Sequence, residues 1–146
     1  MNQTNPLQAY KETSIKTASS GKLIVMLYDA AIRQLTTAVE LLKENGKELD
    51  KVNNCLLRAQ DIVTELMASL DFERGGEIAK NLFSLYMFFN QQLINANIRK
   101  EPEPMEQILN MLSELRGSWV TIAGKTPGEL KNADAAQEGG GVNIAG

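Results

Sequence analysis

The feature that most constrains the fold of this chain is the helical spacing of its apolar residues. They recur at intervals of three and four residues in four long segments, each able to form a helix of about five to seven turns. The segments cover residues 21–45, 49–70, 77–98 and 105–123. The connections between them are short, which favours antiparallel neighbours. The pattern therefore predicts an all-α fold, an antiparallel up-down four-helix bundle.

The regions outside these segments differ in composition and divide the 146-residue chain into three parts. Residues 19–124 contain the four apolar segments, and we expect them to form the bundle domain. Residues 1–18 are mostly polar and are predicted to form a short N-terminal arm. Residues 125–146 are poor in large apolar residues and include three successive glycines at 139–141. Such a segment cannot bury a core, so we expect a flexible, disordered C-terminal tail.

Charge and hydropathy exclude several classes of partner. Fifteen basic residues stand against 18 acidic ones, and no basic block occurs, so nucleic acid is not an expected partner. The longest unbroken apolar run has six residues (23–28), far fewer than the ~20 that span a bilayer. We therefore expect no membrane insertion. The N-terminus carries no apolar signal segment, which argues against secretion.

The absence of histidine and the single cysteine exclude most catalytic and metal sites. Without histidine the chain lacks the commonest general base and metal ligand. Cys55 can form neither an internal disulfide nor a cysteine-rich zinc site, and we interpret it as a half-buried spectator. Asp61 and Glu65 share a helix face and could form a carboxylate pair, but a solvated face explains them better. We predict no enzymatic activity, no metal and no cofactor.

Two short runs contain more apolar residues than one buried helix face requires. Residues 23–28 and 85–89 are apolar at every position. Consecutive helical residues point about 100° apart, so some of these side chains are expected to face outward. The surplus indicates a dimer interface, a broad core, or a groove that accepts amphipathic helices from another chain.

The groove hypothesis assigns partner binding to one set of residues on the first three apolar segments. We expect the outward stripes of the first three segments, together with the end of the third, to supply it: Met26, Tyr28, Ile62, Leu66, Tyr86, Phe89, Leu93 and Asn97. The arm contains three apolar anchors that suit separate pockets on such a surface: Leu7, Tyr10 and Ile15. The arm is therefore predicted to act as a lid that a partner displaces.

Several stretches of the sequence resemble the FliS family of flagellar secretion chaperones. The resemblance is carried, in the family's order, by residues 9–11 (AYK), 17–23 (TASSGKL), 26–29 (MLYD), 58–66 (RAQDIVTEL), 70–82 (LDFERGGEIAKNL), 93–97 (LINAN) and 115–119 (LRGSW). Together these matches cover roughly residues 5–123.

The resemblance implies a function as well as a fold. It implies a cytoplasmic chaperone that binds the disordered C-terminal segment of newly made flagellin, prevents premature polymerisation, and aids delivery to the flagellar export apparatus. It also implies contacts with the export gate and with other flagellar regulators. A structural homodimeric bundle without a flagellin client is the alternative that the apolar pattern leaves open.

Overall fold

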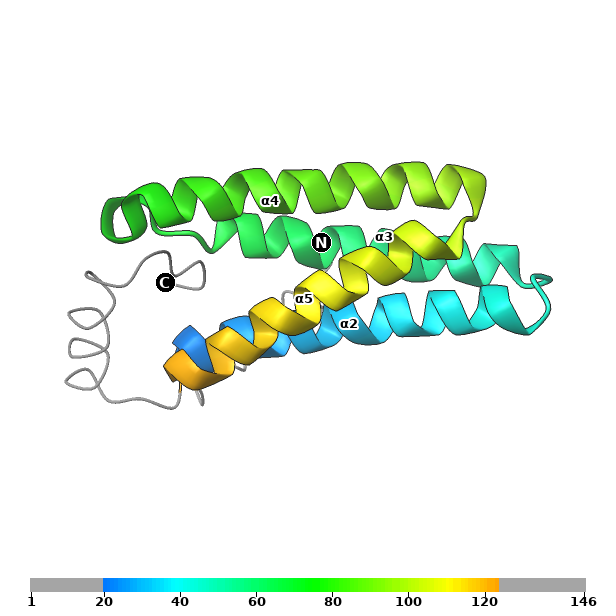
Figure 1. Cartoon of the computed structure of the whole chain (residues 1–146), viewed down its shortest axis with the longest axis horizontal. Coiled ribbons are helices and arrows are strands. Elements are labelled where there is room, and N and C mark those ends of the chain that lie inside the picture. Colours follow the sequence, from blue (N-terminus) through cyan, green and yellow to red (C-terminus); the bar gives the residue numbers. More distant parts are fainter. Residues whose placement is uncertain (1–19, 124–146) are drawn as a thin grey trace, which may run out of the picture.

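The computed structural model describes residues 20–123, which form four long α-helices (Figure 1). The helices and their bounds are α2 Ser20–Glu44, α3 Leu49–Ala68, α4 Phe72–Arg99 and α5 Pro102–Ala123. The predicted arm, with Leu7, Tyr10 and Ile15, and the predicted tail lie outside the described residues.

The helices run alternately in opposite directions, and each is connected to the next at one end of the bundle (Figure 1). α2 and α4 each pack against both α3 and α5, so the four helices form a closed ring in chain order. α5 crosses the bundle obliquely, from α4 at one end towards α2 at the other (Figure 1). This arrangement confirms the predicted antiparallel up-down four-helix bundle.

The core lies along the axis of the ring, and every helix contributes a buried face to it. The largest fully buried side chains are Tyr28, Tyr86, Phe89, Leu27, Leu35, Leu56, Leu66, Leu93, Met105, Ile108, Leu112 and Val52. Burial of each large apolar side chain stabilises the fold by roughly 1.5–3 kcal/mol, so this core is the main source of stability.

The connections follow the turn signals of the sequence, with one difference. Gly46 has a φ of +62°, which ends α2 at the position where the sequence predicts a stop. The Asp71 side chain caps α4 by accepting hydrogen bonds from the backbone N–H groups of Glu73 and Arg74, both at 3.1 Å. α4 begins at Phe72, five residues before the start predicted at 77.

Gly76 explains why the break predicted over residues 71–76 is only a kink. Its φ of +48° and ψ of −124° are non-helical, and helical geometry continues on both sides of it. L-residues with a Cβ rarely adopt this conformation, so glycine is required here. α5 also begins earlier than predicted, at Pro102 rather than at 105, because proline is tolerated in a first helical turn.

Substitutions at two glycines should change stability in opposite directions. Gly76→Ala forces an alanine into a strained conformation and should lower the free energy of unfolding by about 1–3 kcal/mol. Gly117 lies in the exposed interior of α5, and an added Cβ there would have no described heavy atom within 4 Å. Gly117→Ala should therefore raise the free energy of unfolding by about 0.5–1 kcal/mol. Urea denaturation measures both, and a stabilising Gly76→Ala would contradict this assignment.

Candidate functional site

Most of the residues predicted to face outward lie in the core. The structure buries six of them, with exposed fractions of 5% or less: Tyr28, Ile62, Leu66, Tyr86, Phe89 and Leu93. The expected outward orientation is wrong for these six. Because each helix packs against two neighbours, side chains about 100° apart on one helix can both face the interior. A broad core therefore accounts for these six apolar residues.

Two other predicted residues are only partly buried. Met26 on α2 and Asn97 on α4 both have intermediate exposure. The Asn97 Nδ2 donates a hydrogen bond of 2.8 Å to Asn53 Oδ1 on α3. That these eight residues contact a partner stays a prediction.

Tyr28 and Tyr86 form a polar contact across the core between α2 and α4, which are not neighbours in the ring. Their hydroxyl oxygens lie 2.5 Å apart and share a hydrogen bond, and both side chains are buried. Desolvation raises the pKa of both phenols, and for Tyr28 the proximity of Tyr86 adds to the shift while nearby Trp119 opposes it. Both hydroxyls therefore stay protonated at neutral pH.

Removing one of these two hydroxyls should destabilise the bundle more than removing both. Tyr28→Phe leaves the Tyr86 hydroxyl buried without this partner, which costs about 1–3 kcal/mol, whereas the double phenylalanine variant removes both polar groups. Urea denaturation at pH 7 compares the variants. Equal losses in the single and double variants would contradict the hydrogen-bond explanation.

The buried pair of Tyr28 and Tyr86 also predicts that the free energy of unfolding falls at alkaline pH. An unfolded tyrosine loses its proton near pH 10, while the raised pKa keeps these two protonated in the folded state. Above pH 10 the unfolded chain binds fewer protons than the folded one, so stability falls as pH rises and is fully present below pH 10. Urea denaturation between pH 8 and 11 should show a smaller fall for the double phenylalanine variant. An identical fall would contradict this role.

The exposed large apolar residues gather mainly on α4. Nine such residues occur among the described residues: Leu49, Leu57, Phe72, Ile78, Met87, Phe88, Ile94, Ile98 and Val120. Six of the nine belong to α4. Met87, Ile94 and Ile98 are spaced by seven and four residues, so they lie within about 20° of one line along the helix. Their exposed fractions of 52%, 41% and 76% leave this line open to solvent.

Two side-chain hydrogen bonds fix the position of α3 beside this line. Asn90 Nδ2 donates to Thr64 Oγ1 at 3.2 Å, and the Asn97–Asn53 bond lies one seven-residue step further along α4. Leu57 lies between the two bonds on α3, as Ile94 does on α4, and its exposed fraction is 47%. We call Leu57, Met87, Ile94 and Ile98 together the α3–α4 face. The apolar line on α4 was missed by sequence reasoning, although the seven- and four-residue spacing of its members was present.

The two amides that join α3 to α4 are not fully satisfied. The Oδ1 atoms of Asn90 and Asn97 are buried, and neither has a hydrogen-bond partner among the described residues. By contrast, α2 and α5 are joined by ion pairs between Asp29 and Arg116 and between Lys43 and Glu106. The α3–α4 contact therefore carries an energetic cost at these two amide oxygens.

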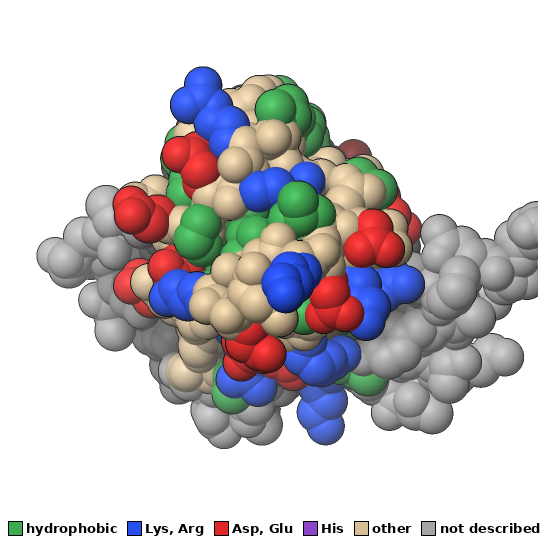
Figure 2. All heavy atoms as spheres, turned by 90° about the vertical axis from the view of Figure 1, so that its right-hand side faces the viewer, with side chains coloured by type: hydrophobic (Ala, Val, Ile, Leu, Met, Phe, Trp, Pro, Cys, Tyr) green, Lys and Arg blue, Asp and Glu red, His purple; other side chains and the backbone are tan. Residues whose placement is uncertain are grey.

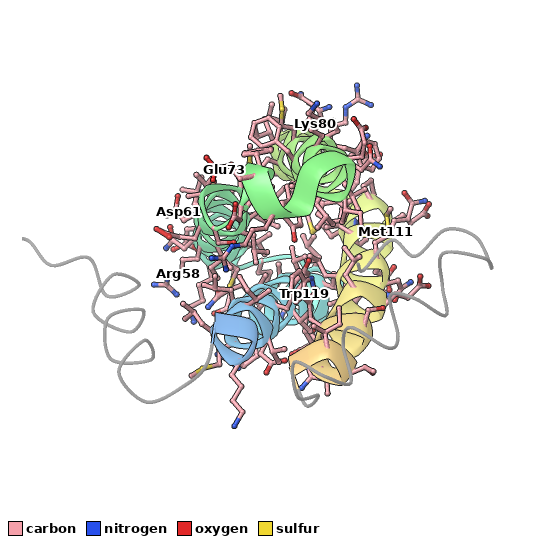
Figure 3. All side chains as sticks on the ribbon, turned by 90° about the vertical axis from the view of Figure 1, so that its left-hand side faces the viewer. Arg58, Asp61, Glu73, Lys80, Met111 and Trp119 are labelled. Atoms are coloured by element: carbon pink, nitrogen blue, oxygen red, sulfur yellow. The ribbon has the colours of Figure 1, made fainter. Side chains whose placement is uncertain are left out.

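The chemistry of the remaining groups fits binding better than catalysis. Cys55 is buried, and desolvation raises the pKa of its thiol, which keeps it protonated and weakly nucleophilic. Asp61 is exposed, and its side chain points from the outer side of α3 into solvent (Figure 3). Residues 20–123 contain no group of three or more Cys, Asp or Glu side chains that could hold a metal ion. None of the four described helices is long and apolar enough to cross a bilayer.

Charge on the surface is mixed rather than concentrated. At the end that carries the α2–α3 and α4–α5 connections, acidic and basic side chains together surround a small hydrophobic area (Figure 2). This end is therefore not a basic patch of the kind that binds phosphate groups. The α3–α4 face contains four of the nine large apolar side chains that are exposed among the described residues.

Comparison with known proteins shows the family. The family described as "Flagellar protein FliS" matches residues 3–126. The flagellar secretion chaperone FliS of Vibrio cholerae is 32% identical over 91% of this chain and 96% of the relative. The FliS chaperones of Salmonella typhimurium and Bacillus subtilis are 36% and 26% identical, over 81% and 79% of this chain and 87% and 84% of those relatives. The chain therefore belongs to the FliS family, whose members are chaperones of flagellar export.

Proposed function

We propose that this chain is a cytoplasmic export chaperone that binds the disordered C-terminal segment of flagellin. Binding keeps newly made subunits from polymerising and presents them to the flagellar export gate; other flagellar regulators are further partners. The protein catalyses no reaction, and its activity is the masking of an assembly surface. Membership of the FliS family supports this role.

The observation that carries the proposal is the exposed apolar surface on α4 and α3. Four large apolar side chains in solvent do not stabilise a bundle that stays alone. On a binding surface they contribute to affinity, because a partner covers them. A disordered client that folds on binding can cover such a surface with an amphipathic helix. Because these side chains are already partly buried in the free bundle, covering the exposed part of each would contribute on the order of 1 kcal/mol.

Gel filtration with light scattering tests the proposal directly. The protein is measured alone and with a peptide that covers the flagellin C-terminus. We expect a stable one-to-one complex. A dimer that depends on protein concentration and ignores the peptide would support the homodimeric bundle instead, and would contradict the chaperone function.

The N-terminal arm is assigned a second role in the same function. Leu7, Tyr10 and Ile15 would cover an apolar surface of the bundle until the client displaces them. Deletion of residues 1–15 should then strengthen client binding and promote self-association of the free protein. If Tyr10 also contacts the bound client, Tyr10→Ala should weaken binding. Calorimetric titration of the three proteins separates these outcomes, and three equal affinities without self-association would contradict both roles.

A further inference from the structure

Two carboxylates lie along the α3 edge of the α3–α4 face. Asp50 and Asp61 are both exposed and are eleven residues apart, which places them within about 20° of one line and about 16 Å from each other along the helix. Neither forms a salt bridge with another described residue. Both carboxylates face solvent, and Asp50 interacts electrostatically with the neighbouring Lys51.

The hydrogen bonds between α3 and α4 locate these carboxylates relative to the apolar line. Asp61 comes three residues before Thr64, which places it between the Thr64–Asn90 and Asn53–Asn97 bonds. Asp50 comes three residues before Asn53, just beyond the second bond and towards the Ile98 end. The acidic edge thus follows the half of the face that contains Ile94 and Ile98.

On the opposite edge of the face, α4 carries no carboxylate next to this half. On α4 the exposed residues beside the apolar line are Ser84, Gln91 and Asn95. Two cations border this edge: the exposed Arg99, one turn beyond Asn95 at the end of α4, and Lys80, which lies towards the start of α4 and pairs with Glu77 at 3.6 Å. The face is therefore apolar along its centre and acidic on its α3 side, while its α4 side carries no carboxylate beside Ile94 and Ile98 and has Arg99 at the Ile98 end.

We propose that the α3–α4 face binds an amphipathic helix of the client whose one edge carries two basic residues about eleven positions apart. This inference rests on the proposed function and adds the chemistry of the bound segment. The apolar stripe of that helix covers Met87, Ile94 and Ile98, and its two cations lie against Asp50 and Asp61. Because both carboxylates lie on one edge of the face, a reversed helix would place its cations on the α4 side, where Arg99 would repel them, so the pairing fixes the direction in which the helix lies.

The test uses charge reversal in the full-length protein. Asp50→Lys and Asp61→Lys are combined, and calorimetry measures the Kd of the flagellin C-terminal peptide at low and high salt. Two lost ion pairs and two new repulsions should weaken binding on the order of tenfold at low salt. Wild-type affinity should fall as salt rises, while that of the variant should not fall, because salt screens attraction in one and repulsion in the other.

The control applies the same charge change elsewhere. Glu103 and Glu114 on α5 are also exposed and eleven residues apart, so Glu103→Lys with Glu114→Lys should leave the Kd near that of wild type. A client peptide whose basic edge is replaced by glutamates should regain affinity for the Asp50→Lys/Asp61→Lys protein. If the wild type binds the peptide and both double variants have equal Kd values, this inference is wrong but the proposed function stands. No binding by the wild type would overturn it together with the proposed function.

Discussion

Met87→Asp combined with Ile94→Asp should abolish binding of the flagellin C-terminal peptide while leaving the melting temperature nearly unchanged. Both side chains are about half exposed, so the folded bundle loses little when they become polar. A bound client helix would bury both. Loss of two such contacts, at roughly 0.7–1.5 kcal/mol each for the exposed half, together with the cost of burying two unpaired carboxylates, corresponds to a Kd weaker by on the order of 100-fold or more.

Val120→Asp provides the matched control for this experiment. Val120 is similarly exposed, at 42%, but it lies on α5, away from the α3–α4 face. Calorimetry should give this variant the affinity of wild type, and thermal unfolding should give all three proteins similar midpoints. If the double aspartate variant binds as tightly as Val120→Asp, the α3–α4 face is not the client surface.

Phe89→Ala should remove about 3–5 kcal/mol from the free energy of unfolding, a large part of the total stability of a domain of this size. The Phe89 side chain is fully buried and lies 6.2 Å, centroid to centroid, from the Tyr86 ring. Its removal leaves a cavity at the centre of the bundle that α4 cannot close without moving. Urea denaturation measures the loss.

Phe88 allows a comparison at the neighbouring position with the same chemistry. Its ring is 45% exposed and faces away from the core side of α4. Phe88→Ala should therefore cost less than about 1 kcal/mol. Similar losses for the two alanine variants would contradict the orientation of α4 in the bundle.

The fold could be predicted from the sequence because its determinants are local. Apolar spacing identified four helices, and Gly46 marked the end of α2. The start of α4 could not be predicted as well, because Gly76 looks like a helix stop until its neighbours are known. In the folded chain Asp71 caps an extra turn before that glycine, and the helix continues beyond it.

The binding surface was harder to predict because orientation depends on packing between distant segments. The run 85–89 contains a surplus of apolar residues, but the sequence does not say which of them face the core. Tyr86 and Phe89 do, whereas Met87 and Phe88 are exposed. The acidic edge could not be predicted for a related reason. Asp50 and Asp61 border an apolar face only when α3 and α4 lie side by side.

The incompletely paired amides between α3 and α4 have a consequence for the internal motions of the bundle. When these helices separate, water can reach the Oδ1 atoms of Asn90 and Asn97, which recover hydration that the closed state denies them. This hydration offsets part of the cost of opening between α3 and α4, whereas opening between α2 and α5 breaks two ion pairs. In hydrogen exchange, the backbone amides of α4 should exchange through local opening before those of α2. The helix that offers most of the exposed apolar surface is thus also the one best able to adjust to the proposed client.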